Sequence, residues 1–193
     1  GISNCKELVN LLLNSNGIED LAILNPLQNL PKLSAIHLSH NSFSNLDPLT
    51  SLENLHSQLV SLHLNSSQVN DFSKLEKFKN LGHLSLSNNE INDINFASSL
   101  RETTLILENN RLTDLSALIV SEGISGTIRL KGNPLSNTAY TTHIPALKAR
   151  GITVDHDALP AGTVTFKDTN LEKAIRDALG IPTELLKKED LAK

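Results

Sequence analysis

Aliphatic and polar residues follow each other in a fixed order along this 193-residue chain, Leu-x-x-Leu-x-Leu-x-x-Asn-x-aliphatic. The order occurs six times between Leu8 and Leu135. Neighbouring members of its asparagine column lie 21 to 26 residues apart. The column reads Asn16, Asn41, Ser67, Asn89, Asn110 and Asn133. Self-similarity at this period predicts a solenoid in which one structural unit stacks on the next.

The Leu-x-Leu centre of each repeat predicts a short strand. Side chains alternate along a strand, so the leucines point into the core and the residues between them point outward. Where the chain leaves each strand, the asparagine amide has both a donor and acceptors and can bridge neighbouring coils. A serine hydroxyl does this only in part, so repeat three, with Ser67, is expected to have the weakest connection.

The convex segments are short and differ in length. Asn25-Pro26 and Asp47-Pro48 each read as a helix N-cap followed by proline in the first helical position. Both lie in the longer repeats. We therefore expect helical turns in these two repeats and 3₁₀ turns in the others.

The repeat pattern stops after Leu135, and we divide the chain there. Residues 1–154 form a repeat solenoid with a C-terminal cap, made of a helix at 138–150 interrupted by Pro145 and a last strand at 152–154. Residues 155–162 are polar, contain proline and glycine, and read as a linker. Residues 163–193 form a helical cap segment that opens a second repeat block.

A helix is predicted over 168–180, with Asp168 as its N-cap and an apolar stripe of Leu171, Ile175 and Leu179. Burial of each such side chain is worth roughly 1.5–3 kcal/mol, so the stripe is not expected to stay in water. We expect it to fold back onto the end of the repeat block, near Ile144, Leu147 and Ile152, or to pair with another copy of the chain.

Several phrases carry a family resemblance, namely NNEINDI at 88–94, NNRLTDLSAL at 109–118 and GNPLS at 132–136 followed by IPALKARGITV at 144–154. They resemble the short bacterial leucine-rich repeats of the internalin type, and more distantly the repeats of phosphatase-regulating proteins. The resemblance implies an α/β leucine-rich repeat solenoid, right-handed, with a parallel concave β-sheet, a convex side of 3₁₀ or short helical turns, and a terminal helical segment.

The tail at 164–182 resembles the helical cap that begins a further block of such repeats in bacterial surface proteins. The resemblance thus implies an extracellular or cell-surface bacterial protein, of which we expect this chain to be one part. We expect a monomer, with a dimer created by truncation as the alternative.

Composition narrows the function. The net charge of −4 gives no basic patch for nucleic acid, and no apolar run approaches the ~20 residues that span a bilayer. Cys5 has no cysteine to pair with. No hydrolase, metalloprotease or nucleotide-binding motif occurs. We expect a non-catalytic protein without cofactors.

The outward residues of the predicted sheet form the candidate binding face for a protein partner or, alternatively, a glycan. The partner-binding residues we select are Leu12, His37, His40, His63, His83, Ser85, Ile106, Glu108, Arg129 and Lys131. Leu12 and Ile106 would be apolar anchors, and Arg129 and Lys131 would dock an acidic group. We assign no metal site, although His37, His63 and His83 could hold zinc, sense pH or simply keep the face hydrated.

Two other functions remain compatible with the pattern. An aromatic content of 3% favours a structural stalk without a specific ligand, because binding hot spots are rich in Trp and Tyr. The distant resemblance to phosphatase-regulating repeats allows an intracellular regulatory subunit.

Overall fold

The computed structural model describes residues 1–101, 103–166, 168–181 and 185–192. Seven parallel strands form one sheet in the order of the chain, which confirms the predicted leucine-rich repeat solenoid. The strands are β1 (Asn10–Leu12), β2 (Ala35–His37), β3 (Ser61–His63), β4 (His83–Ser85), β5 (Thr104–Ile106), β6 (Thr127–Arg129) and β7 (Thr153–Asp155).

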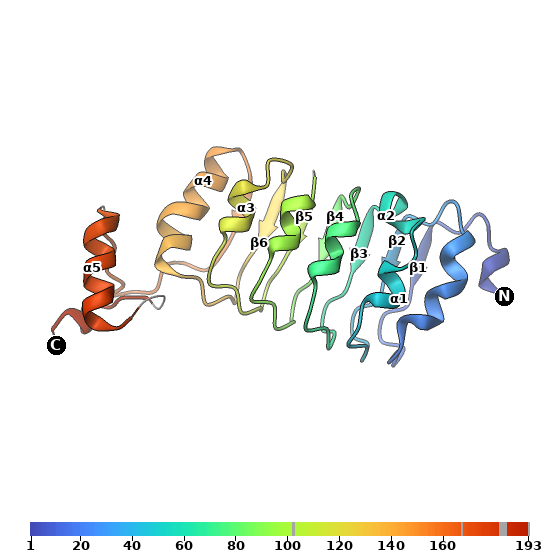
Figure 1. Cartoon of the computed structure of the whole chain (residues 1–193), viewed down its shortest axis with the longest axis horizontal. Helices are drawn as coiled ribbons and strands as arrows, with labels where there is room; N and C mark the ends of the chain where they lie inside the picture. Colours follow the sequence, from blue (N-terminus) through green and yellow to red (C-terminus); the bar gives the residue numbers. More distant parts are fainter. Residues whose placement is uncertain (102, 167, 182–184, 193) are drawn as a thin grey trace.

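Short helices cover one side of the sheet, the convex side, and the coils follow one another in a row with the two termini at opposite ends (Figure 1). The helical segments are η1 (Ile2–Asn4), η2 (Leu21–Asn29), α1 (Asp47–Thr50), α2 (Leu55–Gln58), η3 (Ser73–Lys77), η4 (Asn95–Ser99), α3 (Ser116–Val120), η5 (Ala139–His143), α4 (Ile144–Ala149), α5 (Thr169–Leu179) and η6 (Asp190–Ala192).

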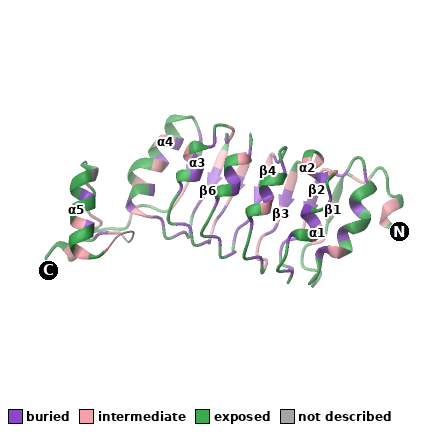
Figure 2. Ribbon diagram, in the orientation of Figure 1, coloured by how far each residue is buried: buried purple, intermediate pink, exposed green. Residues whose placement is uncertain are grey.

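The core lies between the sheet and the convex segments. The inward residues of neighbouring strands are in register, and Ile36, Leu62, Leu84, Leu105 and Ile128 are all 0% exposed. Buried residues follow one another from coil to coil, whereas α5 is largely exposed (Figure 2). Each coil therefore buries its apolar face against its neighbours, as repeat proteins require.

The asparagine column joins consecutive coils. Asn110 Nδ2 donates to the carbonyls of Leu86 and Leu107, both at 3.0 Å, and Asn110 Oδ1 accepts from Ile91 N at 3.1 Å. Similar bonds surround Asn41, Asn89 and Asn133. The predicted bridging role of the asparagines is confirmed at these four positions.

Two positions of the column behave differently. Asn16 is exposed, and its amide donates to Asn14 O, within its own coil. The Ser67 hydroxyl donates to Asn89 Oδ1 at 3.0 Å. Within the described ranges, no hydrogen bond links the Ser67 side chain to repeat two. Repeat three therefore lacks the side-chain bridge to the preceding coil that Asn41, Asn89, Asn110 and Asn133 make; that its connection is the weakest remains a prediction.

The convex turns correct one prediction. Pro48 stands in the first turn of α1, as expected, but the N-cap is Leu46, and Asp47 is already the first residue of the helix. Pro26, however, lies inside the nine-residue 3₁₀ helix η2, which is capped by the Asp20 side chain accepting from Ala22 N. The shorter fifth repeat carries the α-turn α3. Repeat length therefore does not determine whether a convex turn is α or 3₁₀. In the first repeat, the Asp20 cap already starts the 3₁₀ helix upstream of Asn25, so Asn25 is not its N-cap.

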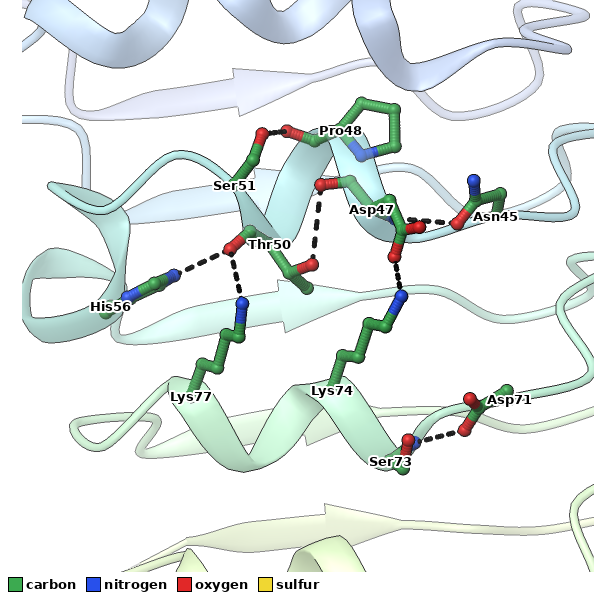
Figure 3. Close-up of polar contacts among 10 residues, drawn as sticks. All are labelled: Asn45, Asp47, Pro48, Thr50, Ser51, His56, Asp71, Ser73, Lys74 and Lys77. Atoms are coloured by element: carbon green, nitrogen blue, oxygen red, sulfur yellow. Dashed lines mark hydrogen bonds and ion pairs between the residues drawn. The ribbon is translucent and has the colours of Figure 1, made fainter.

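Neighbouring convex turns are joined by side chains that reach one coil back (Figure 3). Lys74 forms an ion pair with Asp47, and this partner lowers the pKa of the Asp47 carboxyl below its usual value. Thr50 O accepts from Lys77 Nζ at 3.5 Å and lies 2.8 Å from His56 Nε2. The Lys74–Asp47 pair is exposed, so it contributes little to the free energy of unfolding and serves mainly to align the two turns.

The C-terminal end of the block is closed by one continuous helical segment. The π-turn η5 leads directly into α4, so Pro145 opens an α-turn and does not interrupt the helix. Ile144, Leu147 and Ile152 are buried in the main core. The last strand, β7, pairs with β6.

The tail departs from the expected packing. Helix α5 begins after Asp168, as predicted, because the Asp168 carboxylate accepts from Asn170 N and Leu171 N. Its buried face carries Glu172 and Arg176, whereas Leu171 is 52% exposed. The predicted docking of the apolar stripe onto Ile144, Leu147 and Ile152 is therefore wrong.

A polar pair forms the contact instead. Asn137 at the end of the block donates to Glu172 Oε1 at 2.9 Å. The segment also has its own small apolar centre, because Leu186 is fully buried, and Val164 N donates to Leu186 O.

Candidate binding face

The strand register places the selected side chains in adjacent columns of the concave face. Leu12, His37, His63, Ser85, Ile106 and Arg129 form the central column across six strands. His83 pairs with Ser61, and so lies one column away from His63. The predicted columns are confirmed in position; whether they bind a partner remains a prediction.

Three histidine rings stack across β2, β3 and β4. The ring centroids of His37 and His63 are 3.9 Å apart, with an interplanar angle of 27°. Those of His63 and His83 are 4.9 Å apart, with an angle of 24°. The strand spacing of about 4.7–4.9 Å brings side chains of neighbouring strands to stacking distance. The stack therefore presents a continuous row of imidazole edges along the sheet.

Two histidines of the stack, His63 and His83, have lowered pKa values. Burial, followed by the nearby His37 and His83, lowers the pKa of His63 to about 4. Burial also lowers the pKa of His83, and the charges of His37 and Arg129 act in the same direction. Loss of hydration and mutual repulsion both disfavour the protonated rings. At pH 7 the His63 ring is therefore polar but uncharged.

The side chains on either side of the stack differ in exposure. Leu12 is 64% exposed at one end, whereas Ile106 is half-buried. Ser85 is only 4% exposed, and its hydroxyl donates to Asn65 Oδ1 at 2.8 Å. Leu12 is therefore accessible to a partner, whereas Ser85 serves mainly to hold Asn65.

A polar column that the selection omitted stiffens the face. Asn14 Oδ1 accepts from Ser39 N at 2.9 Å, and Asn65 Oδ1 accepts from Ser87 N at 2.7 Å. Each amide thus caps the N–H group of the next strand. The signal for Asn14 and Asn65 was their shared position in the repeat.

The basic end of the face is partly neutralised. Lys131 Nζ lies 2.8 Å from Asp155 Oδ1, and this ion pair raises the pKa of Lys131 and lowers that of Asp155. Glu108 is half-buried and Arg129 is exposed. Sequence reasoning missed Asp155 because it stood at the boundary of the predicted linker, whereas the structure places it in β7 beside Lys131.

His40 lies in the turn after β2. Its φ of 58° is left-handed, as are those of Ser15, Ser66, Asn88 and Asn109 in the equivalent turns. Gly132 closes this column with φ +74°, and a Cβ there would lie 2.1 Å from Asn109 Oδ1. His40 is exposed in this turn and is not one of the stacked rings.

No metal centre is defined by the stack. Among the residues that the structure describes, no group of three or more His, Cys, Asp or Glu side chains has an arrangement that could hold a metal ion. In the Asp155-His156-Asp157 triplet, the side chains reach different partners, namely Lys131, Lys148 Nζ at 3.0 Å and Gly132 N at 2.7 Å. Within the described ranges, no helix is long and apolar enough to cross a membrane.

Solved structures share this architecture. Internalin C2 of Listeria monocytogenes has a TM-score of 0.59 and 26% identity, over 81% of this chain and 74% of the internalin chain. A leucine-rich repeat protein of Leptospira interrogans has a TM-score of 0.64 and 25% identity, over 81% and 38%. A second L. monocytogenes internalin, 19% identical with a TM-score of 0.54, shows the shared fold over 81% and 58%.

The fold and its neighbours define a leucine-rich repeat protein, a class whose scaffold serves as a protein-binding module. Within that class, this chain is an internalin-like leucine-rich repeat protein.

No family model matches the chain. A curated relative, tubulin-specific chaperone E of Dictyostelium discoideum, is 34% identical over 110 residues. That match covers 47% of this chain but only 20% of the relative, so the chain spans about a fifth of the relative's length.

Proposed function

We propose that this chain is a non-catalytic recognition module that binds a protein partner through its concave face, in a secreted or surface-exposed bacterial protein. The observation that carries the proposal is the central column. It combines an exposed apolar side chain, Leu12, with the stacked rings of His37, His63 and His83. Apolar and weakly hydrated groups lose little on desolvation, so they favour binding of a complementary surface.

The geometry favours a protein over a single small ligand. The face extends over seven strands, and a sheet of that width offers the area that protein interfaces bury. The bacterial surface location rests on the likeness to internalin C2 and the Leptospira protein.

An intracellular regulator is the second candidate, and one specific observation favours it. The repeats are 34% identical to part of tubulin-specific chaperone E, a protein named for a role toward tubulin. Binding of purified tubulin by this chain, weakened by substitutions on the concave face, would support that function over surface recognition.

Site-resolved photocrosslinking tests the main proposal. A photoreactive residue replaces Ile106 on the concave face or, as a matched control, Val120, which is 71% exposed on α3 of the convex side. We expect crosslinks to a discrete protein from position 106 only. The captured protein is then purified, and its Kd is measured against Leu12→Asp and Val120→Asp variants.

Loss of affinity by about tenfold or more for Leu12→Asp, with no change for Val120→Asp, would support the proposal. Equal crosslinking from both faces, or equal affinity of both variants, would refute concave recognition. Capture of an oligosaccharide in place of a protein would show that the concave face binds glycan.

A further inference from the structure

A cavity of about 560 Å³ lies at the other end of the molecule, between the last repeats and α5. Its wall includes three carboxylates and two basic side chains, namely Asp114, Glu172, Asp177, Lys173 and Arg176. A cavity of this size accommodates a small organic molecule or one side chain of a partner. The concave face does not contribute to it.

The charges in this wall do not cancel. Arg176 pairs with Glu172 at 2.9 Å, and Lys173 pairs with Asp177 at 2.9 Å. Asp114 remains, and the base nearest to it is His143, whose Nδ1 lies 3.3 Å from Asp114 Oδ1 without hydrogen-bond geometry. The cavity therefore has an excess of one negative charge when His143 is neutral.

Two acceptor atoms in the same wall have no donor. Asn137 is fully buried, and its Nδ2 donates to Glu172, but its Oδ1 has no hydrogen-bond partner among the described residues. The two hydrogen bonds and the ion-pair contact of Glu172 all end on Oε1, so within the described ranges Oε2 accepts none. Asn137 Oδ1 is the buried one of the two, and a buried acceptor without a donor costs free energy, which a ligand with N–H groups would recover.

We propose that this cavity binds a primary ammonium group, from a free aliphatic amine or from a lysine side chain of a partner. An ammonium has three donors and one positive charge. Asn137 Oδ1, Glu172 Oε2 and the Asp114 carboxylate supply three acceptors and the excess negative charge. The ligand would lie between the repeat block and α5, and so would hold the two together.

Other ligand classes fit less well. An anion would meet Arg176 and Lys173 already paired with carboxylates. A metal ion needs a tighter group of ligands, and no such group of three acidic, histidine or cysteine side chains is present in the part of the chain that the structure describes. An ammonium needs only hydrogen-bond acceptors and charge.

Titration of the full 193-residue chain at low salt, followed by NMR, tests this site. The probes are n-butylamine and the peptide acetyl-Gly-Lys-Gly-amide. The controls are n-butanol, which has no charge, and tetramethylammonium, which has charge but no N–H donor. We expect both amine probes to shift the side-chain amide signal of Asn137 and to slow hydrogen exchange in α5, and the controls to do neither.

Two substitutions move the affinity in opposite directions. Asp114→Asn removes the excess charge and should weaken n-butylamine binding by about tenfold. Lys173→Gln frees the Asp177 carboxylate and should strengthen it by about threefold. Asp71→Asn is the matched control, because Asp71 opens the equivalent Asp-x-Ser turn two repeats earlier, where its Oδ1 accepts from Ser73 N at 2.8 Å (Figure 3).

The result is decisive in either direction. Binding by n-butylamine alone assigns the site to free amines, and binding by the lysine peptide assigns it to a partner's side chain. Equal shifts of the Asn137 amide signal with tetramethylammonium, or an n-butylamine affinity that is unchanged in Asp114→Asn, would refute the proposed ammonium site. Asn137 Oδ1 would then be hydrated by solvent. Neither outcome affects the concave face, so failure here is distinct from failure of partner recognition.

Discussion

Replacement of Asn89 by alanine is the sharpest test of how the coils are held together. Asn89 Nδ2 donates to Leu64 O at 3.1 Å and to Leu86 O at 2.9 Å, and its Oδ1 accepts from Ser67 N at 2.9 Å. Leu86 O keeps a second donor, Asn110 Nδ2 at 3.0 Å. The substitution therefore removes the partner of three groups, namely Leu64 O, Ser67 N and the Ser67 hydroxyl.

Each orphaned buried group costs roughly 1–3 kcal/mol, and water partly reaches the half-buried Ser67, so we expect a loss of about 2–4 kcal/mol. Urea unfolding followed by circular dichroism measures it. Asn16→Ala is the matched control, because Asn16 occupies the same column but is exposed and bridges no preceding coil. Its cost should stay below about 0.5 kcal/mol. Equal stabilities of the two variants would refute the bridging argument.

Three further predictions follow from the same structure. Ser67→Asn should raise the free energy of unfolding by about 1 kcal/mol in urea titrations, because an amide there completes the bridge to repeat two. The folded-state pKa of His63 is about 4, below the usual value of 6.5, so the unfolded chain takes up the proton first as the pH falls. The free energy of unfolding should therefore have its full value above pH 6.5 and decrease between pH 6.5 and 4. The decrease should be smaller in His63→Gln. An NMR titration in which His63 ionises near pH 6.5 would contradict this. Gly132→Ala should cost about 1–2 kcal/mol because its φ is +74°, whereas Gly82→Ala, whose Cβ would lie 3.6 Å from Val60, should be close to neutral; thermal melts compare them.

The repeated part of the fold was predictable because one short pattern determines both the strand and its bridge. The alternation around Ile36, Leu62 and Leu84 set the register correctly, and so placed His37 beside His63. The lowered pKa of His63 was not predictable, because it depends on burial between neighbouring rings.

The tail shows where sequence reasoning stops. A helix after Asp168 follows from local capping, but its orientation does not. The apolar stripe implied an inward face, whereas the structure buries Glu172 and Arg176, which satisfy each other and Asn137. The choice between the two faces depends on a tertiary polar contact and on Leu186, and neither shows in the helix pattern.

The asparagine column gives the solenoid a direction. In each bridge the side-chain oxygen belongs to the later coil and accepts an N–H group of the earlier one, as Asn133 does for Leu112 and Asn110 does for Ile91. Removal of a coil from the C-terminal end therefore takes away the one amide that both accepts from and donates to the coil before it. Removal of a coil from the N-terminal end leaves the next asparagine with the bond that it makes inside its own coil. Under force or stepwise truncation, unravelling should spread more readily from the last repeat toward the first than in the reverse direction.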